Sequence, residues 1–394
     1  MSYTKVILKP KKEESLQRFH PWIFSGAIQS IEGKPEEGDI VDVYSSSRHF
    51  LAVGHYQIGS IAVRILSFKE TIIDDSFWLE HIRKAYNLRV SLGLVGTEYN
   101  NTYRLVHGEG DNLPGLIVDI YAHTAVMQAH SVGMHYARHQ LTEALKAILG
   151  DDLHTVYYKS ETTLPFKANL DNEDGYLYGN EVEDVAVENG LKFYVDWQKG
   201  QKTGFFVDQR DNRALLERYA AGRSVLNMFC YTGGFSFYAM RGKARLVHSV
   251  DSSSKAIYLT KKNVELNFPG DPRHGAFAED AFKYLEKAGD AYDLIILDPP
   301  AFAKHKNVLR NALQGYRKLN AIAFEKIKPG GIVFTFSCSQ VVSRETFRLT
   351  VFSAAAQAGR NVRILHQLSQ PADHPINIYH PEGEYLKGLV LHVE

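Results

Sequence analysis

Strand-like and helix-like segments alternate regularly from about residue 191 onward. Short apolar, β-rich runs are separated by longer amphipathic stretches, which is typical of βαβ units. Such units build a doubly wound parallel sheet, so we predict an α/β fold of the Rossmann-like kind for this region. We expect strands at 224–229, 246–250, 292–297 and 332–336, helices at 235–241, 253–267, 281–288, 312–327 and 343–358, and two last strands at 361–367 and 386–392.

Three regions differ in the kinds of segment that they contain, and we predict domains at 1–70, 71–190 and 191–394. The first holds short β-type runs divided by glycine and polar turns, which favours a small barrel. The middle region mixes both kinds of element, so we expect an α+β domain. Its predicted elements are a helix at 77–92, paired strands at 116–121 and 125–129, a helix at 135–149 and an acidic connector at 171–188.

Composition excludes several classes of protein. With 44% hydrophobic and 23% charged residues, the chain of 394 residues is an ordinary globular protein. The first twenty residues hold lysines without an apolar core, so no signal peptide is expected. The two cysteines, Cys230 and Cys338, lie in apolar strand-like segments, which argues against a disulfide framework and for the cytoplasm. The 17 histidines show no metal-ligand spacing, so we expect no metal.

The charge balance is neutral, with 45 basic and 45 acidic residues. Nucleic-acid binding relies on neutralising phosphates, so this balance is weak evidence against it. Local basic patches can still exist within a neutral total. The charge alone therefore leaves RNA binding open.

A glycine pair, Gly233 and Gly234, follows the first predicted strand of the last region. Glycines at a strand-to-helix turn let a ligand approach the backbone and its amide donors. The dehydrogenase fingerprint of three spaced glycines is absent, which argues against a dinucleotide. The pattern favours a smaller nucleoside cofactor.

Two acids follow the next predicted strands. Asp251 closes the second strand, where a carboxylate can accept both ribose hydroxyls. Asp280 follows the third, where it could meet an adenine amino group. Each acid alone is more often a helix N-cap. Their placement on consecutive strands favours the nucleoside site.

A thiol and an acidic turn follow two further strands. Cys338 lies near the end of the run 330–339, and Asp298 begins the turn Asp298-Pro299-Pro300. Open α/β sheets place ligands at the carboxyl ends of their strands. This placement suggests covalent chemistry, while the alternative is that Cys338 is a small buried hydrophobe.

In their order, these motifs resemble those of class I S-adenosylmethionine-dependent methyltransferases. More narrowly, the chain resembles the ribosomal RNA large-subunit methyltransferase I family, which makes 5-methylcytosine. The likeness runs through the whole chain, and the first region is similar to a PUA RNA-binding module. The segments that carry it are 20–26, 105–116, 202–210, 374–375 and 379–388.

The resemblance implies S-adenosylmethionine as cofactor, RNA (large-subunit ribosomal RNA) as substrate, and a homodimer. Asp251 would take the ribose and Asp280 the adenine, and either Phe205 or Phe206 would simply pack in the core. The implied cofactor contacts are Phe206, Asp208, Arg210, Asn227, Tyr231, Thr232, Gly233, Asp251, Asp280 and Asp298. The implied substrate contacts are Pro299, Pro300, Phe302, Lys304 and Lys306.

Cys338 would be the nucleophile, with Asp298 beside it. A thiolate adding to carbon 6 of cytosine activates carbon 5, and a base must later remove the carbon 5 proton. Many RNA cytosine-5 methyltransferases carry a second cysteine where this chain has Pro300. The base therefore stays open between Asp298, Lys304, another lysine and water, and Cys230 is interpreted as structural rather than catalytic.

Other functions fit parts of the pattern. The Asp-Pro-Pro turn followed by aromatic Phe302 also resembles enzymes that methylate exocyclic amines, where Cys338 would be dispensable. Phe302 could stack on a flipped base in either case. A noncatalytic RNA-binding assembly factor is a further alternative. Basic residues that could contact phosphates are Lys9, Lys11, Lys12, Arg18 and Arg64.

Overall fold

A computed structural model describes residues 3–165, 170, 173–180, 185–303 and 305–394. By their contacts the residues form two compact units. Unit 1 comprises Met1–Val187, Val195–Phe205 and Ala372–Gly383. Unit 2 comprises Glu188–Tyr194, Phe206–Pro371 and Glu384–Glu394. Two segments from later in the chain, Val195–Phe205 and Ala372–Gly383, thus belong to unit 1.

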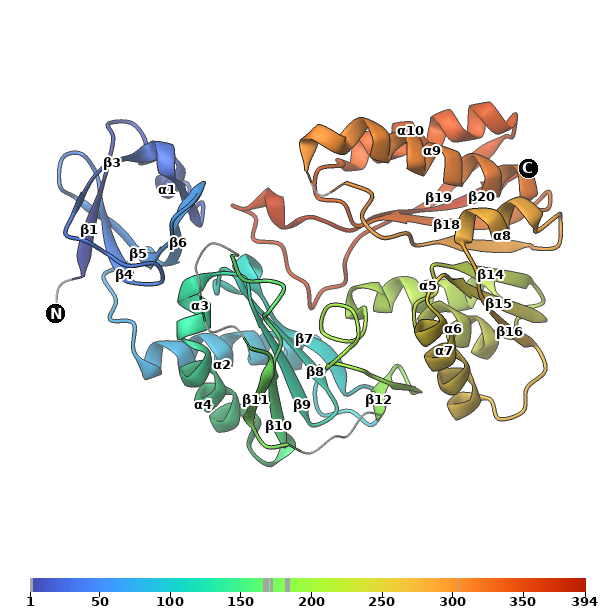
Figure 1. Ribbon diagram of the computed structural model, residues 1–394, viewed down its shortest axis with the longest axis horizontal. Helices are drawn as coiled ribbons and strands as arrows, with labels where there is room; N and C mark the ends of the chain where they lie inside the picture. The colour runs from blue at the N-terminus through green and yellow to red at the C-terminus, as the bar shows by residue number, and fades with distance from the viewer. Residues whose placement is uncertain (1–2, 166–169, 171–172, 181–184, 304) are drawn as a thin grey trace. The chain divides into compact units, whose positions relative to one another are not determined.

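Unit 2 is built on a seven-stranded sheet, of order β16-β15-β14-β17-β18-β20-β19 (Figure 1). Neighbours from β16 to β18 are parallel, as predicted, whereas β20 is antiparallel to both β18 and β19. The strands are β14 (Ser224–Met228), β15 (Leu246–Asp251), β16 (His274–Ala278), β17 (Leu294–Leu297), β18 (Gly331–Ser337), β19 (Val362–Leu368) and β20 (Lys387–Val393).

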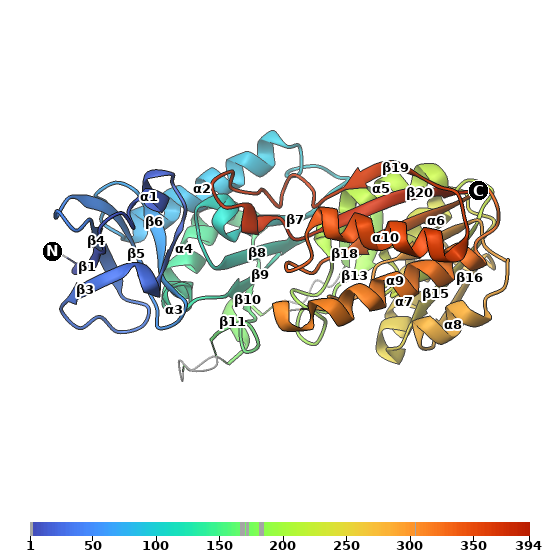
Figure 2. The same cartoon turned by 90° about the horizontal axis from the view of Figure 1, so that it is seen from above.

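Helices cover both faces of this sheet, because its central strands are apolar on both sides. Along β17, Ile295 and Leu297 face one buried cluster, and Leu294 and Ile296 face another. One face is covered by α8 (Ala281–Lys287), α9 (Leu309–Lys326) and α10 (Arg344–Ala358), the last two side by side in Figure 2. The other is covered by α5 (Arg210–Tyr219), α6 (Gly234–Arg241) and α7 (Ser254–Asn267). The α/β expectation is confirmed.

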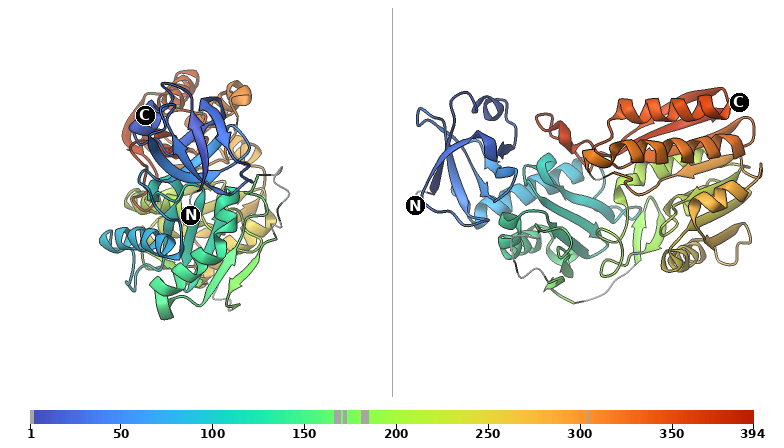
Figure 3. Two further views of the ribbon diagram at one scale, coloured as in Figure 1. Left: turned by 90° about the vertical axis from the view of Figure 1, so that its left-hand side faces the viewer. Right: turned by 45° about the horizontal axis from the view of Figure 1, so that its top comes forward.

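The N-terminal part of unit 1 is a six-stranded sheet of order β2-β6-β5-β4-β1-β3 around its own apolar core (Figure 3). Most of its strand pairs are antiparallel, and β1 pairs with β4 in parallel. Its elements are β1 (Thr4–Leu8), α1 (Glu14–Gln17), β2 (Trp22–Phe24), β3 (Ile28–Glu32), β4 (Ile40–Tyr44), β5 (Phe50–Tyr56) and β6 (Ile61–Ser67).

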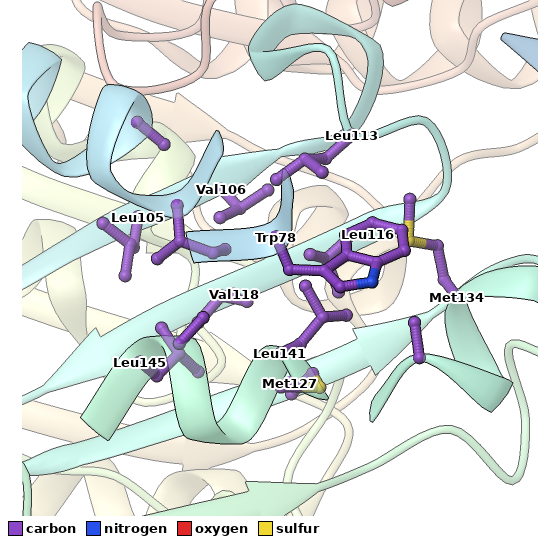
Figure 4. Close-up of a cluster of buried hydrophobic side chains, with 14 of the residues drawn as sticks. Trp78, Leu105, Val106, Leu113, Leu116, Val118, Met127, Met134, Leu141 and Leu145 are labelled. Atoms are coloured by element: carbon purple, nitrogen blue, oxygen red, sulfur yellow. The ribbon is translucent and has the colours of Figure 1, made fainter. Parts of the chain in front are cut away.

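The rest of unit 1 packs helices on a five-stranded sheet of order β11-β10-β9-β8-β7. Figure 4 shows Trp78 amid aliphatic side chains of this core, with Val106 and Leu116 among them. The elements are α2 (Asp75–Ser91), β7 (Thr102–His107), β8 (Leu116–Tyr121), β9 (Thr124–Ala129), α3 (Val132–Tyr136), α4 (Arg138–Leu149), β10 (Thr155–Tyr158) and β11 (Gly175–Tyr178). A two-stranded sheet of β12 (Val185–Glu188) and β13 (Leu191–Tyr194) follows.

Two expectations for the middle region were wrong. The helix expected at 135–149 is two helices, because α3 ends at Tyr136 and α4 begins at Arg138. The stretch at 171–188 was expected to be a connector, but it holds β11 and β12. These strands are short, and acidic residues beside them hide the alternation of apolar and polar residues in the sequence. Residues 171–172 and 181–184 lie outside the described residues. No helix in the described part of the chain is long and apolar enough to cross a bilayer.

A buried ionic network ties the segment 372–383 into unit 1. Arg89 is fully buried and forms a bidentate pair with Asp111, at 2.5 and 2.8 Å. It also donates to the carbonyl of Asp373, 2.7 Å away. The Asp373 carboxylate in turn accepts from the backbone N–H of Arg104 at 2.9 Å. A buried guanidinium needs this full set of acceptors, so the network fixes where the segment lies.

Removing the Trp78 side chain should destabilise unit 1. Trp78 is 2% exposed at the centre of its core, so Trp78→Ala should cost about 3–5 kcal/mol through lost burial and a cavity. Urea unfolding measures this. Tyr99→Ala, at a side chain 72% exposed, is the control and should change stability by under about 0.5 kcal/mol. Equal effects of both substitutions would contradict the packing described.

Candidate active site

The carboxyl ends of the parallel strands bring the predicted residues to one edge of the sheet. Met228 of β14 pairs with Leu297 of β17, which pairs with Thr335 of β18. Asp298 therefore begins the loop after β17, and Cys338 follows β18 directly. This is the edge where open α/β sheets bind ligands.

The glycine loop between β14 and α6 has an unusual backbone. Phe229, Tyr231 and Gly233 have φ angles of 57°, 46° and 88°. Left-handed conformations cost non-glycine residues about 1–2 kcal/mol each, and such strain clusters at ligand sites. Gly233 cannot be replaced without rearrangement, since a Cβ atom would lie 2.8 Å from the Thr260 methyl group.

Asp251 fastens this loop. Its carboxylate accepts from the backbone N–H groups of Tyr231, at 3.1 Å, and of Ser253, at 2.9 Å. The N-cap of α7 is Ser253, so the alternative of a capping role for Asp251 was wrong. The half-buried carboxylate lies beside the loop that a nucleoside would contact.

Asp280 does cap a helix. Its Oδ1 accepts from the backbone N–H of Lys283 at 3.0 Å, at the start of α8. The side chain is exposed. The capping alternative is confirmed, and a contact with adenine stays a prediction that the exposed carboxylate allows.

Two buried oxygens at the loop have no hydrogen-bond partner among the described residues: Asn227 Oδ1 and Thr232 Oγ1. The amide of Asn227 is held in place, because its Nδ2 donates to Ser236 Oγ at 2.9 Å, and that hydroxyl lies 2.6 Å from Ser249 Oγ. Buried acceptors left without donors are costly. A ligand rich in hydroxyl and amino groups fits this loop, so the residues are compatible with S-adenosylmethionine.

The segment before α5 borders the same loop. The Phe206 ring lies 5.2 Å from the Tyr231 ring, edge to face, while Phe205 is 3% exposed and packs in the core. The Arg213 Nη1 donates to the Phe206 carbonyl at 2.9 Å. Arg213 is itself held by Glu188 in a fully buried bidentate pair at 2.8 and 2.6 Å.

Asp208 and Arg210 are both buried. Tyr385 donates its hydroxyl hydrogen to Asp208 Oδ2 at 2.8 Å. The Arg210 Nε lies 3.6 Å from the Asp211 carboxylate. Both residues thus belong to the packed wall of the site, and their contact with a cofactor stays a prediction.

Cys338 is half-buried and sits between two anchored serines. Ser337 donates to the Tyr316 hydroxyl at 3.0 Å, and Ser339 donates to the carbonyl of Ala303. The second bond ties the turn after β18 to the loop after β17. The pKa of Tyr316 is raised to about 12, mainly by burial and to a smaller extent by Cys338 and Asp298, so both acidic groups lie near this ring.

The acidic-proline loop is held by Gln209, the residue directly before α5. Gln209 donates to Asp298 Oδ2 at 3.0 Å and accepts from Asn212 at 2.6 Å. Pro299 is buried and Pro300 is exposed. The Phe302 ring packs 4.6 Å from Tyr316.

The two lysines predicted for substrate fall beyond this loop. Lys304 lies outside the described residues, and Lys306 begins a short 3₁₀ turn, Lys306–Val308, with its side chain not described. Their roles stay predictions.

Cys230 lies in the glycine loop and is buried. Burial, with a smaller effect of Asp251, raises the pKa of its thiol well above the ordinary range. A group held as a thiol is a poor nucleophile, which supports the structural interpretation.

Sequence reasoning missed the residues that support the site. Gln209, Arg213, Tyr385 and Lys387 each hold a neighbour of the predicted residues. Gln209, Tyr385 and Lys387 lie within the quoted motifs 202–210 and 379–388. The motifs therefore pointed to these residues, but they did not predict which neighbours the residues contact.

Comparison with known proteins agrees with this geometry. The family model for S-adenosylmethionine-dependent methyltransferases matches residues 141–379, and a PUA-like domain model matches residues 6–68. Curated relatives from Tolumonas auensis and Aeromonas hydrophila are 41% and 40% identical, over 98% of this chain and 99% and 98% of theirs. Both are named ribosomal RNA large subunit methyltransferase I.

Solved structures share the fold over the full chain. A protein of Streptococcus mutans described as a SAM-dependent methyltransferase is 22% identical, with a TM-score of 0.84 and 100% of both chains covered. A second structure, described as a methyltransferase complexed with SAH, is 23% identical with a TM-score of 0.85 over 100% of both chains.

The fold, the strained glycine loop and the family model define an S-adenosylmethionine-dependent methyltransferase with a PUA-like N-terminal domain. Within that class, the chain belongs to the ribosomal RNA large subunit methyltransferase I family.

Replacing Thr232 by Val should separate stability from cofactor binding. Removing the orphaned hydroxyl should stabilise the cofactor-free protein by about 1 kcal/mol, and weaken S-adenosylmethionine binding roughly three- to ten-fold. Thermal unfolding and calorimetric titration measure the two. Thr335→Val, which removes another orphaned buried hydroxyl, is the control and should leave affinity unchanged. Unchanged affinity in Thr232→Val would show that the cofactor does not use this hydroxyl.

Replacing Asp280 by Asn tests the adenine contact. Asparagine caps helices as well as aspartate, so stability should not change. Cofactor affinity should fall about tenfold, because an amide is a weaker acceptor than a carboxylate. Asp74→Asn, at the N-cap of α2, is the matched control. If both variants bind the cofactor like the parent protein, Asp280 is only a cap.

Proposed function

We propose that this enzyme methylates carbon 5 of a cytosine in large-subunit ribosomal RNA, through a covalent adduct with Cys338, in the cytoplasm. The observation that carries the proposal is the position of Cys338. It is half-buried at the end of β18, beside the loop that Asp298 begins, at the edge that also holds the glycine loop. The names of the curated relatives support the RNA substrate.

The chemistry requires a nucleophile because carbon 5 of cytosine is unreactive. S-adenosylmethionine, when bound, would supply a methyl group from a positively charged sulfur, which would keep the electron pair of the broken sulfur–methyl bond. The Cys338 thiolate forms a bond from Sγ to carbon 6, which makes carbon 5 electron-rich enough to accept that methyl. A base then removes the carbon 5 proton, the ring double bond re-forms, and the Sγ–carbon 6 bond breaks with its electrons returning to sulfur.

Asp298 is proposed to assist these steps. Its Oδ2 is fixed by Gln209, which is itself fixed by Asn212, so the carboxylate has a defined orientation. A fixed carboxylate can accept from the base edge or take the carbon 5 proton. The position of a second cysteine is filled by Pro300, and Cys230 is held as a thiol. We therefore propose Asp298, directly or through water, as the elimination base.

Surface features of unit 1 support RNA binding. Lys11, Lys12 and Arg18 are exposed around the N-terminal sheet. Phe19 is 47% exposed and its ring lies 5.2 Å from that of Tyr379, so two exposed aromatic rings lie together in the unit that carries these basic residues. Such pairing suits unpaired RNA, whose bases stack on aromatic rings. Arg64, by contrast, is half-buried and donates to Gln57 at 3.0 Å, so it is a weaker candidate for phosphate.

Replacing Cys338 by Ala should abolish methyl transfer while leaving cofactor binding unchanged. Cys230→Ala is the matched control and should retain activity, since that thiol is buried and protonated. The measurement is mass analysis of nucleosides from ribosomal RNA after incubation with labelled cofactor. RNA containing 5-fluorocytosine should trap the parent enzyme as a denaturation-stable complex, because fluorine cannot leave as a proton does.

Full activity of Cys338→Ala would overturn the cytosine-5 assignment. The exocyclic-amine alternative then predicts methylation of 5-fluorocytosine without trapping. Binding of RNA with no turnover by the parent protein would instead support an assembly factor.

A further inference from the structure

A chain of hydrogen bonds leads from the glycine loop across the sheet of unit 2. It begins at Asn227, whose Nδ2 donates to Ser236 Oγ at 2.9 Å. The Ser236 and Ser249 hydroxyl oxygens lie 2.6 Å apart, and Ser249 Oγ lies 2.8 Å from His274 Nε2. The first three members are at most 1% exposed, whereas His274 is half-buried. The chain therefore connects the end of β14 to a histidine on the edge strand β16.

Strand pairing places these groups on one face of the sheet. Asn227 of β14 is paired with Ser249 of β15. His274 is paired with Val247, two residues before Ser249, and side chains two residues apart in a strand point to the same face. Val247 belongs to the buried apolar cluster of that face. Polar groups in such surroundings are costly unless each is hydrogen-bonded, so the chain has to be satisfied along its length.

The hydroxyl protons of the chain fit one direction. Ser236 accepts from the Asn227 amide, so its own hydroxyl hydrogen needs an acceptor, and Ser249 Oγ is beside it. The Ser249 hydrogen needs an acceptor in turn, and His274 Nε2 is beside it. The opposite direction would leave the Ser236 hydrogen buried without an acceptor, which is costly. In this arrangement His274 carries its ring proton on Nδ1 and keeps a lone pair on Nε2.

His274 can accept because its ring is neutral near pH 7. Burial lowers the pKa of His274 to about 4, His248 and Lys261 lower it further, and Asp271 opposes them. The Asp271 carboxylate is itself paired with Arg273. The far end of the chain is therefore a neutral acceptor rather than a charged donor.

We propose that His274 fixes the orientation of the Asn227 amide, so that the amide oxygen, and not its NH₂ group, is the acceptor offered to S-adenosylmethionine at the glycine loop. Without the lone pair of His274, both serine hydroxyls would be free to reverse and the amide would be free to flip. Within the part of the chain that the structure describes, Asn227 Oδ1 has no hydrogen-bond partner, as expected of an acceptor kept for a ligand.

His274 is thus a positioning residue that acts through two serines. Its role rests on the predicted contact of Asn227 with the cofactor. It does not depend on which atom of the RNA the proposed reaction methylates, because the chain lies on the cofactor side of the site.

Calorimetric titration of the full-length protein with S-adenosylmethionine tests this role without turnover. His274→Leu removes the lone pair and should weaken binding about ten-fold, the effect of losing one hydrogen bond to the ligand. His274→Gln should bind within about two-fold of the parent protein, because the glutamine Oε1 can accept from Ser249. The matched control is His248→Leu, which should leave affinity unchanged. His248 precedes Ser249 on β15 but points to the opposite face, where its Nδ1 lies 2.8 Å from the Tyr292 hydroxyl oxygen.

Asn227→Leu separates the chain from the contact that it serves. If Asn227→Leu weakens binding while His274→Leu does not, His274 does not orient the amide and the proposal is overturned. If Asn227→Leu binds like the parent protein, the predicted cofactor contact is wrong and the proposal fails with it. The activity of Cys338→Ala bears on the proposed cytosine chemistry alone.

The tautomer of His274 provides a measurement on the parent protein, which stays decisive if His274→Leu does not fold. Nitrogen chemical shifts of histidine-labelled protein report it, and His274→Gln identifies the signal. A proton on Nδ1 is expected, and a proton on Nε2 would contradict the direction of the chain. Thermal unfolding of each variant monitors folding. A histidine that only supports the fold predicts lower unfolding temperatures with unchanged affinity, which would also overturn the proposal.

Discussion

The pairing of β17 with β14 on one side and β18 on the other is the constraint on which the site depends. It aligns Met228, Leu297 and Thr335 in one row across the sheet, so the loops beyond them emerge at the same edge. A slip of one residue would exchange the two faces of each strand and expose its apolar side chains. Burial of the sheet under helices on both faces therefore also fixes the distance between the glycine loop, Asp298 and Cys338.

Much of this arrangement could be predicted from the sequence. Period and composition place four of the five parallel strands within two residues, because each is a short apolar run between turn residues. The bounds of β16 were not predicted; it was expected only as a third strand before Asp280. The edge at which Asp251 and Asp298 lie follows from the parallel order alone. Capping was harder to predict, since Asp251 and Asp280 look alike in sequence. Only the structure shows that Ser253 caps α7 and leaves Asp251 for the loop.

Contacts between distant parts of the chain could not be predicted. Arg213 supports Phe206 only because Glu188, at the end of β12, neutralises it. Lys387 reaches the turn after Cys338 because β20 pairs antiparallel with β18, a reversal that no local pattern signals. Helix α5 was also missed: half of its residues are charged, and its helical form depends on packing against α6. Helices and strands follow largely from local sequence, whereas the side chains that support a site come from distant parts of the chain.

The position of β20 has a consequence for the order of assembly. It lies between β18 and β19, yet it is synthesised after both. Until it is made, β18 presents an unpaired apolar edge, the kind of edge that joins other chains. A growing chain folds from its N-terminal side, so unit 1 can form most of its core before the sheet of unit 2 is complete. The strand that completes the sheet also brings Lys387, whose ammonium holds the turn after Cys338 through two carbonyls, so this edge of the sheet is finished only when the last strand has been made.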